Sequence, residues 1–263
     1  MQIDGMERLE LRYAVGYECN LACRHCYNRH LVNPASHPGS EATDPKRDTA
    51  RLQKLMAVFA LEGLVVTGGE PFFTPLRERT LALIAVALDD GLLVRVSTNG
   101  MFLTDSVCRR LQNMVYGGRN LLLQVSLDAA EPSVHDFIRG CFGAHEAAVK
   151  GVQTAIEKGL NVRVRCTISR HNVGEVVDCY DLCRRLGVSE FIGKPCIPFG
   201  PTENRWGHAP EPQAFAEVRS RLMKKARDGG PRLRLAHFYS FKNLLKVILA
   251  KECAFWLPLK EAS

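Results

Sequence analysis

Short strand-like runs alternate with longer helical patterns along most of the chain, and this alternation limits the fold more than any other feature. Strands separated by helices normally form right-handed crossovers, so the pattern predicts a parallel sheet. The expected strands are residues 9–17, 63–68, 92–98, 121–128, 161–169 and 190–197, and the expected helices are residues 48–60, 76–90, 104–115, 145–159 and 173–187.

The expected strands alternate between polar and apolar residues, which bears on how the sheet is covered. In residues 161–169, Arg163, Arg165 and Thr167 share one face, and apolar residues fill the other. A doubly wound sheet has helices on both faces, and its strands should be almost continuously apolar. The pattern leaves both folds open but favours a partial barrel with helices outside and a polar interior.

The C-terminal quarter differs from the repeated part. Residues 198–212 are rich in proline and mark the end of the repeat, and residues 213–263 are expected to be mostly helical. We therefore predict a core over residues 1–200 and a C-terminal helical extension over residues 201–263. An apolar stripe in the extension is expected to pack on the open edge of the barrel, with a partner or membrane surface as the alternative: Phe241, Leu244, Leu245, Ile248 and Leu249.

Composition excludes several classes of protein. The 263 residues are 46% apolar and carry a net charge of +7, an ordinary balance for a globular protein. The start lacks the apolar segment of a signal peptide, and the longest apolar run, residues 81–88, is too short to cross a membrane. No basic block indicates nucleic-acid binding. We expect a cytoplasmic protein whose ten cysteines do not form a disulfide framework.

Three cysteines, Cys19, Cys23 and Cys26, lie within eight residues of the segment "YECNLACRHCYN". A closed iron–sulfur cluster uses four thiolates, so three would hold a [4Fe–4S] cluster and leave one iron open. An open position is also what separates catalytic from structural zinc sites. The alternatives are scattered structural cysteines, or a zinc site with His25 or His30 as fourth ligand.

Four segments in order resemble the radical SAM superfamily. "CNLACRHCYN" resembles its cluster-binding loop, with Tyr27 after the third cysteine, and "TGGEPF" at 67–72 resembles its glycine-rich segment. "STNG" at 97–100 and "SLDAAEPSVHDFIRG" at 126–140 resemble its next two strand ends. The likeness covers about residues 9–200 and is nearest to the branch with the molybdenum-cofactor GTP cyclase and the SPASM-type peptide- and haem-modifying enzymes.

The resemblance implies a partial (β/α)6 TIM-like barrel with its site at the carboxyl ends of the strands. It implies an oxidoreductase in which a [4Fe–4S] cluster on the three cysteines reductively cleaves S-adenosylmethionine, and the resulting 5′-deoxyadenosyl radical abstracts hydrogen from a peptide or small anionic metabolite. The electron would come from an external donor such as flavodoxin or ferredoxin. The cofactor-binding residues that it implies are Tyr27, Gly68, Gly69, Glu70, Asn99, Ser126, Asp128 and Arg139.

The roles expected of these residues follow from their chemistry. Gly68 and Gly69 would let backbone approach a ligand, and Glu70 would accept hydrogen bonds from an ammonium group. Ser126 and Asp128 would face the ribose or the amino-acid end of SAM. Arg139 would pair with the SAM carboxylate.

Basic residues expected inside the barrel, Arg95, Arg163, Arg165 and Lys194, suggest an anionic group on the substrate. The alternative is that nearby acids satisfy them. The last 60 residues contain only Cys253, so an auxiliary SPASM cluster is missing or the chain ends where such a module would begin. A different class of function also fits the three cysteines: a non-catalytic iron–sulfur or zinc module that senses redox state or binds a partner.

Overall fold

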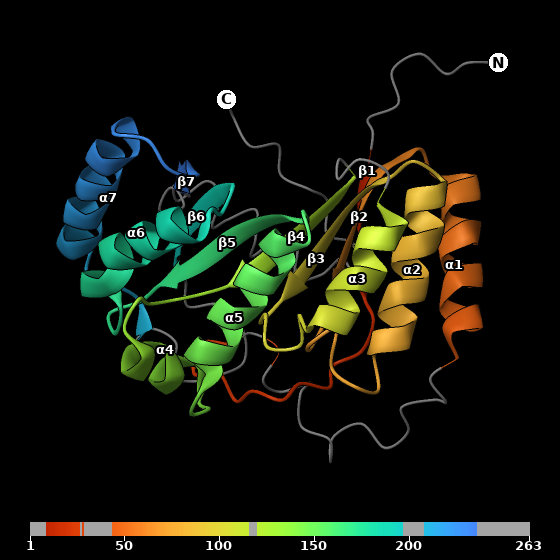
Figure 1. The fold of residues 1–263 in the computed structure, drawn as a ribbon, viewed down its shortest axis with the longest axis horizontal. Helices are drawn as coiled ribbons and strands as arrows, with labels where there is room; N and C mark the ends of the chain where they lie inside the picture. The colour runs from red at the N-terminus through yellow and green to blue at the C-terminus, as the bar shows by residue number, and fades with distance from the viewer. Residues whose placement is uncertain (1–8, 27, 29–43, 116–119, 197–207, 236–263) are drawn as a thin grey trace, which may run out of the picture.

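The computed structural model describes residues 9–26, 28, 44–115, 120–196 and 208–235. Within them, one sheet contains seven parallel strands that follow one another in sequence order (Figure 1). The strands are β1 (Leu9–Ala14), β2 (Leu61–Thr67), β3 (Leu93–Thr98), β4 (Leu121–Ser126), β5 (Asn161–Ile168), β6 (Glu190–Pro195) and β7 (Arg232–Leu235).

The helices gather along one face of this sheet (Figure 1). In the described residues they are α1 (Pro45–Val58), α2 (Arg77–Asp89), α3 (Asp105–Met114), α4 (Pro132–Arg139), α5 (Ala144–Glu157), the short 3₁₀ helix η2 (Val173–Glu175), α6 (Val176–Leu186) and α7 (Pro212–Arg227).

The strand order separates the two folds that the sequence left open. A doubly wound sheet reverses its strand order in the middle and is covered on both faces. Here the order is β1 to β7 without reversal, and the described residues show no pairing between β1 and β7. The sheet is therefore a partial barrel, as the alternation of polar and apolar residues predicted.

The apolar face of each strand packs against the helices. On β5, Val162, Val164, Cys166 and Ile168 are all buried in the main core, whereas Arg165 on the opposite face is partly exposed. Neighbouring strands are in register, with Val125 of β4 opposite Val164, so the apolar rows are continuous across the sheet.

Two elements differ from the sequence prediction. The predicted barrel has six strands, but β7 pairs in parallel with β6 inside the segment expected to be helical. Helix α4 was not predicted, although Pro132 begins it and Gly140 ends it in the left-handed conformation, with φ of 66°. The division of the chain at residue 200 stays a prediction, and the apolar stripe at residues 241–249 lies outside the described residues.

No helix in the described part of the chain combines the length and the apolar character needed to cross a bilayer.

Candidate functional site

The three cysteines lie in one side-chain cluster beyond the carboxyl end of β1. Cys19, Cys23 and Cys26 pack together with Leu21 and Ala144, separately from the main core. A turn closes the loop between them, in which the Cys26 amide donates to the Cys23 carbonyl oxygen over 3.2 Å. None of the three forms a disulfide. The loop therefore brings three thiols, none of them in a disulfide, into one cluster.

The surroundings of these thiols are apolar on one side and cationic on the other. Burial raises the pKa of the Cys19 thiol to about 12, although the Leu21 amide donates to its sulfur over 3.4 Å. The Arg139 Nη1 donates to the Cys23 Sγ over 3.8 Å. Without a metal, Cys19 would stay protonated at neutral pH, so a thiolate at Cys19 requires a strong electrophile such as iron or zinc.

The glycine pair after β2 supports the start of the cysteine loop. A Cβ on Gly68 would lie 2.1 Å from the Gly16 carbonyl oxygen, and one on Gly69 would lie 2.1 Å from the Glu18 carbonyl oxygen. The Gly69 and Glu70 amides donate to those same two oxygens, each over 2.8 Å. Sequence reasoning expected a ligand to approach these glycines. The chain itself occupies that space, and a contact with SAM stays a prediction.

Glu70 joins the end of β2 to the end of β3. It is 1% exposed, and its carboxylate accepts from Thr98 Oγ1 over 2.6 Å, from the Asn99 amide over 2.6 Å and from the Phe72 amide over 3.1 Å. Burial raises the pKa of Glu70 to about 7, against the opposing effect of these hydrogen bonds. Glu70 was expected to accept a hydrogen bond from an ammonium group. Its two carboxylate oxygens already accept from Thr98, Asn99 and Phe72, so an ammonium group would have to share them.

Asn99 connects β3 to the cysteine loop. Its Nδ2 donates to the Oδ1 of Asn20 over 2.8 Å, and Asn20 lies between the first two cysteines. The ends of β1, β2 and β3 are thereby tied together by backbone and amide contacts. Asn20 and Thr98 were not among the predicted site residues, although both lie inside the quoted segments.

Arg139 and Asp128 form an ion pair beneath the loop. Arg139 Nη2 lies 2.7 Å from Asp128 Oδ2, and the two residues are 6% and 0% exposed. Burial acts to raise the pKa of Asp128, but the charge of Arg139 helps to hold it below its usual value. Asp128 also accepts from the Thr167 amide over 2.9 Å. Asp128 and Arg139, both expected to contact SAM, thus have protein partners already.

Ser126 and Tyr27 complete the predicted set. Ser126 ends β4 on the inward face and is partly exposed, so it remains available to a ligand. Tyr27 lies outside the described residues. Asn28 was not predicted, but its Nδ2 donates to the Gly68 carbonyl oxygen over 3.2 Å and so joins the far end of the cysteine loop to the glycine pair.

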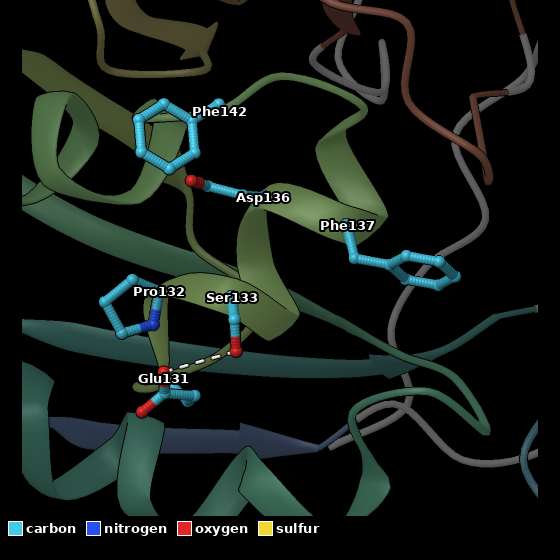
Figure 2. Close-up of a pocket in the computed structure, with 6 residues that line it drawn as sticks. All are labelled: Glu131, Pro132, Ser133, Asp136, Phe137 and Phe142. Atoms are coloured by element: carbon cyan, nitrogen blue, oxygen red, sulfur yellow. Dashed lines mark hydrogen bonds between the residues drawn. The ribbon is translucent and has the colours of Figure 1, made fainter.

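A surface pocket of about 530 Å³ lies on the outer side of α4 (Figure 2). Its aromatic side chains are Phe137 and Phe142, and Phe142 is 99% exposed. The six residues that line it include none of the predicted site residues. Helix α4 therefore carries Arg139 toward the cysteines, whereas Phe137 on the same helix and Phe142 in the loop after it are exposed.

The donor set fits an iron–sulfur cluster better than a single metal ion. No three His, Cys, Asp or Glu side chains in the described residues are placed to share one ion. A cubane cluster makes a different demand, because each thiolate binds its own iron. The Nε2 of His25, the possible zinc ligand, lies 3.9 Å from Asp128 Oδ2. His30 lies outside the described residues.

Comparison with known proteins gives relatives over most of the chain. The AdoMet-dependent heme synthase of Nitratidesulfovibrio vulgaris is 29% identical over 93% of this chain and 59% of its own length. The mycofactocin maturase MftC of Mycobacterium tuberculosis is 31% identical over 68% of this chain and 42% of its own length. The chain thus spans about half the length of these relatives.

The fold has solved counterparts as well. The Streptococcus suis SuiB structure bound to S-adenosylmethionine aligns with a TM-score of 0.71 at 13% identity, over 88% of this chain and 51% of that one. Finally, residues 13–183, well over half of the chain, match the sequence profile of the Radical SAM superfamily. This stretch contains the cysteine loop, both glycine-containing strand ends and the Arg139–Asp128 pair, and the chain belongs to the radical SAM superfamily.

Proposed function

We propose that the chain is a radical SAM enzyme whose Cys19, Cys23 and Cys26 hold a [4Fe–4S] cluster and whose substrate is a peptide or a small anionic metabolite. The gathering of three thiols in one cluster, at the carboxyl end of the first strand of a parallel partial barrel, supports the proposal most strongly. A cluster there would supply the electron that splits SAM into methionine and a 5′-deoxyadenosyl radical, which takes a hydrogen atom from the substrate.

The residues around the thiols have separate tasks in this proposal. Arg139 donates to the Cys23 sulfur and so places a positive charge beside the expected cluster. Glu70 and Asn99 fix the ends of β2 and β3 against the loop, so the thiols keep their spacing when substrate binds. Ser126, which is partly exposed on the inward face, would contact SAM.

The proposal extends to partners and location. One-electron cleavage needs an external donor, and we assign this role to a flavodoxin or ferredoxin. Free thiols and a low-potential donor both favour the cytoplasm. The relatives are named as synthases of haem-type cofactors and as a peptide maturase, so the substrate classes to try first are porphyrins and peptides. Residues 201–263 would form a C-terminal extension, or the start of a SPASM-like module.

Production of 5′-deoxyadenosine tests the function. The full chain is reconstituted anaerobically with iron and sulfide, then incubated with SAM and dithionite. We expect 5′-deoxyadenosine from the wild type and from a Cys141→Ser control, because Cys141 packs against the same cluster of side chains but lies outside the triplet. A Cys19/Cys23/Cys26→Ala variant should form none. Equal production by that variant would overturn the assignment.

The competing function is a non-catalytic metal module that senses redox state. It accounts for the three thiols but gives no reason for the Asn99 and Glu70 contacts that position three strand ends around them. Metal analysis separates the two: about one zinc per chain and no sulfide would favour the sensor.

A further inference from the structure

The inward face of the sheet, opposite the helices, carries far more positive than negative charge. By strand register, its charged residues come from β1, β3, β5, β6 and β7. Among the described residues, two carboxylates on this face stand against at least six cations. The carboxylates are Glu10 and Glu190, and the cations are Arg12, Arg95, Arg163, Arg165, Lys194 and Arg234.

The two carboxylates are already shared. Glu10 pairs with Arg95 and lies 3.7 Å from Arg12. Glu190 lies 3.2 Å from Arg163 and 3.6 Å from Arg234. Each carboxylate therefore serves two arginines, and among the described residues of this face the cations outnumber the carboxylates.

Lys194 takes part in none of these pairs. It lies one residue before the end of β6, near the carboxyl end of the barrel, with Thr167 of β5 as its register partner. In the described part of the chain, no carboxylate lies within ion-pair distance of it. Burial, followed by the charges of Arg165 and Arg12, lowers the pKa of Lys194 to about 8. The lysine is therefore held among like charges.

The curvature of the sheet concentrates this charge. Arg12 lies on β1 and Arg234 on β7, the two edges of the sheet, yet both act electrostatically on Lys194 and on Arg95. Cations from opposite edges thus surround one space. SAM would not neutralise it, since its sulfonium and ammonium groups outweigh its single carboxylate.

We infer that the inward face of the sheet binds the anionic oxygen groups, carboxylate or phosphate, of a polyanionic substrate, with Lys194 and Arg165 nearest the reacting end. This inference rests on the proposed function, because it assigns the substrate class of the same barrel. Lys194 is partly buried with no carboxylate of the described residues in ion-pair distance, which costs stability, and a bound anion would remove that cost.

Binding of two simple polyanions tests the inference without a known substrate. The probes are citrate and pyrophosphate, titrated calorimetrically into the full reconstituted chain at low ionic strength, with sodium chloride of matched ionic strength as the reference. We expect saturable binding to the wild type. Lys194→Met should weaken it by about tenfold or more, since one charge-assisted contact is lost. Lys194→Arg should retain binding, and Arg165→Gln serves as a second variant.

A second readout separates binding from a merely structural role. Without probe, Lys194→Met should melt at a higher temperature than the wild type, because a repelled charge is gone, and citrate should raise its melting temperature less. The matched control is Lys150→Met, an exposed lysine on α5, which should change neither quantity. Citrate binding that is unchanged in Lys194→Met, or a melting temperature that is not raised, would overturn the inference.

Titration with SAM shows whether these cations bind the substrate or the carboxylate of SAM. If SAM binds Lys194→Met as it binds the wild type, the cations serve the substrate. If SAM affinity falls in parallel with citrate affinity, they serve the SAM carboxylate and the inference is wrong. Neither binding measurement depends on the production of 5′-deoxyadenosine. A failure of this inference can therefore be told apart from a failure of the proposed function.

Discussion

The rim of the barrel and its inward face are built by different means. At the rim, the ends of β1, β2 and β3 are joined by backbone hydrogen bonds, two close-packed glycines and the buried carboxylate of Glu70. On the inward face, long charged side chains from five strands share too few counter-charges. These contacts tie the three strand ends of the rim together, which suits a cofactor of fixed shape. Among the described residues, the inward face has fewer carboxylates than cations, which suits an anionic ligand.

The largest expected effect is at the glycine pair of the rim. Gly68→Ala should cost about 4 kcal/mol or more of unfolding free energy, because φ is 126° and the new Cβ would meet the Gly16 carbonyl oxygen. Gly91→Ala is the control: its φ is 80°, but no atom lies within 4 Å of the added Cβ, so it should cost about 1 kcal/mol. Urea unfolding measures both, and equal costs would contradict the close packing of the rim.

The next effect contrasts an ion pair of the rim with one of the inward face. Asp128→Ala leaves Arg139 buried without its partner and should cost about 3–5 kcal/mol. Glu190→Gln should cost only about 1 kcal/mol, because Arg163 also donates to Gln124 Oε1 over 2.7 Å. Chemical denaturation of the two variants decides the point. A larger cost for Glu190→Gln would reverse the comparison.

Glu70 makes the stability of the rim depend on pH. Its folded-state pKa is raised from 4.5 to about 7, so the folded state holds a proton that the unfolded state has lost between these values. The contribution is therefore fully present below about pH 4.5 and lost as pH rises through 7, a change of about 3 kcal/mol. His25 and His135, whose pKa values burial lowers to about 4 and about 3, add a slope of opposite sign in the wild type and in Glu70→Gln alike. The difference in unfolding free energy between the two proteins from pH 5 to 8 should therefore show the Glu70 contribution, and a difference that does not change with pH would refute the assignment.

The smallest effect is at the outer edge of the rim. The Arg24 guanidinium lies 4.0 Å from the centre of the Phe137 ring, and its Nε donates to the Phe137 carbonyl oxygen over 2.9 Å. Arg24→Ala should cost about 1 kcal/mol of unfolding free energy. Arg24→Lys keeps the charge but loses the planar group, and it should recover part of that cost. A neutral Arg24→Ala would show that this contact adds no stability.

The sequence predicted the parts of the molecule that depend on local pattern. The alternation of Arg163 and Arg165 with apolar neighbours was enough to predict an inward polar face, because strand period alone decides which face a side chain takes. β7 was missed since its four residues include two arginines and follow a long helix. α4 was missed because its residues were interpreted only as a continuation of β4.

Contacts between distant segments could not be predicted from the sequence. The oxygens that fill the space beside Gly68 and Gly69 come from Gly16 and Glu18, about fifty residues earlier. Likewise, only the fold shows that Arg139 is paired with Asp128. Such pairings depend on how β1, β2 and α4 are placed, and a single sequence contains no direct signal for them.

The iron and sulfide content of the reconstituted protein tests the central claim most directly. The wild-type chain should bind about four irons and four sulfides, and each single Cys→Ala change at Cys19, Cys23 or Cys26 should remove most of both. Adding SAM should alter the electron paramagnetic resonance spectrum of the reduced cluster, because one iron lacks a cysteine. A chain that binds about one zinc and no sulfide, or a cluster that survives loss of all three cysteines, would contradict the account.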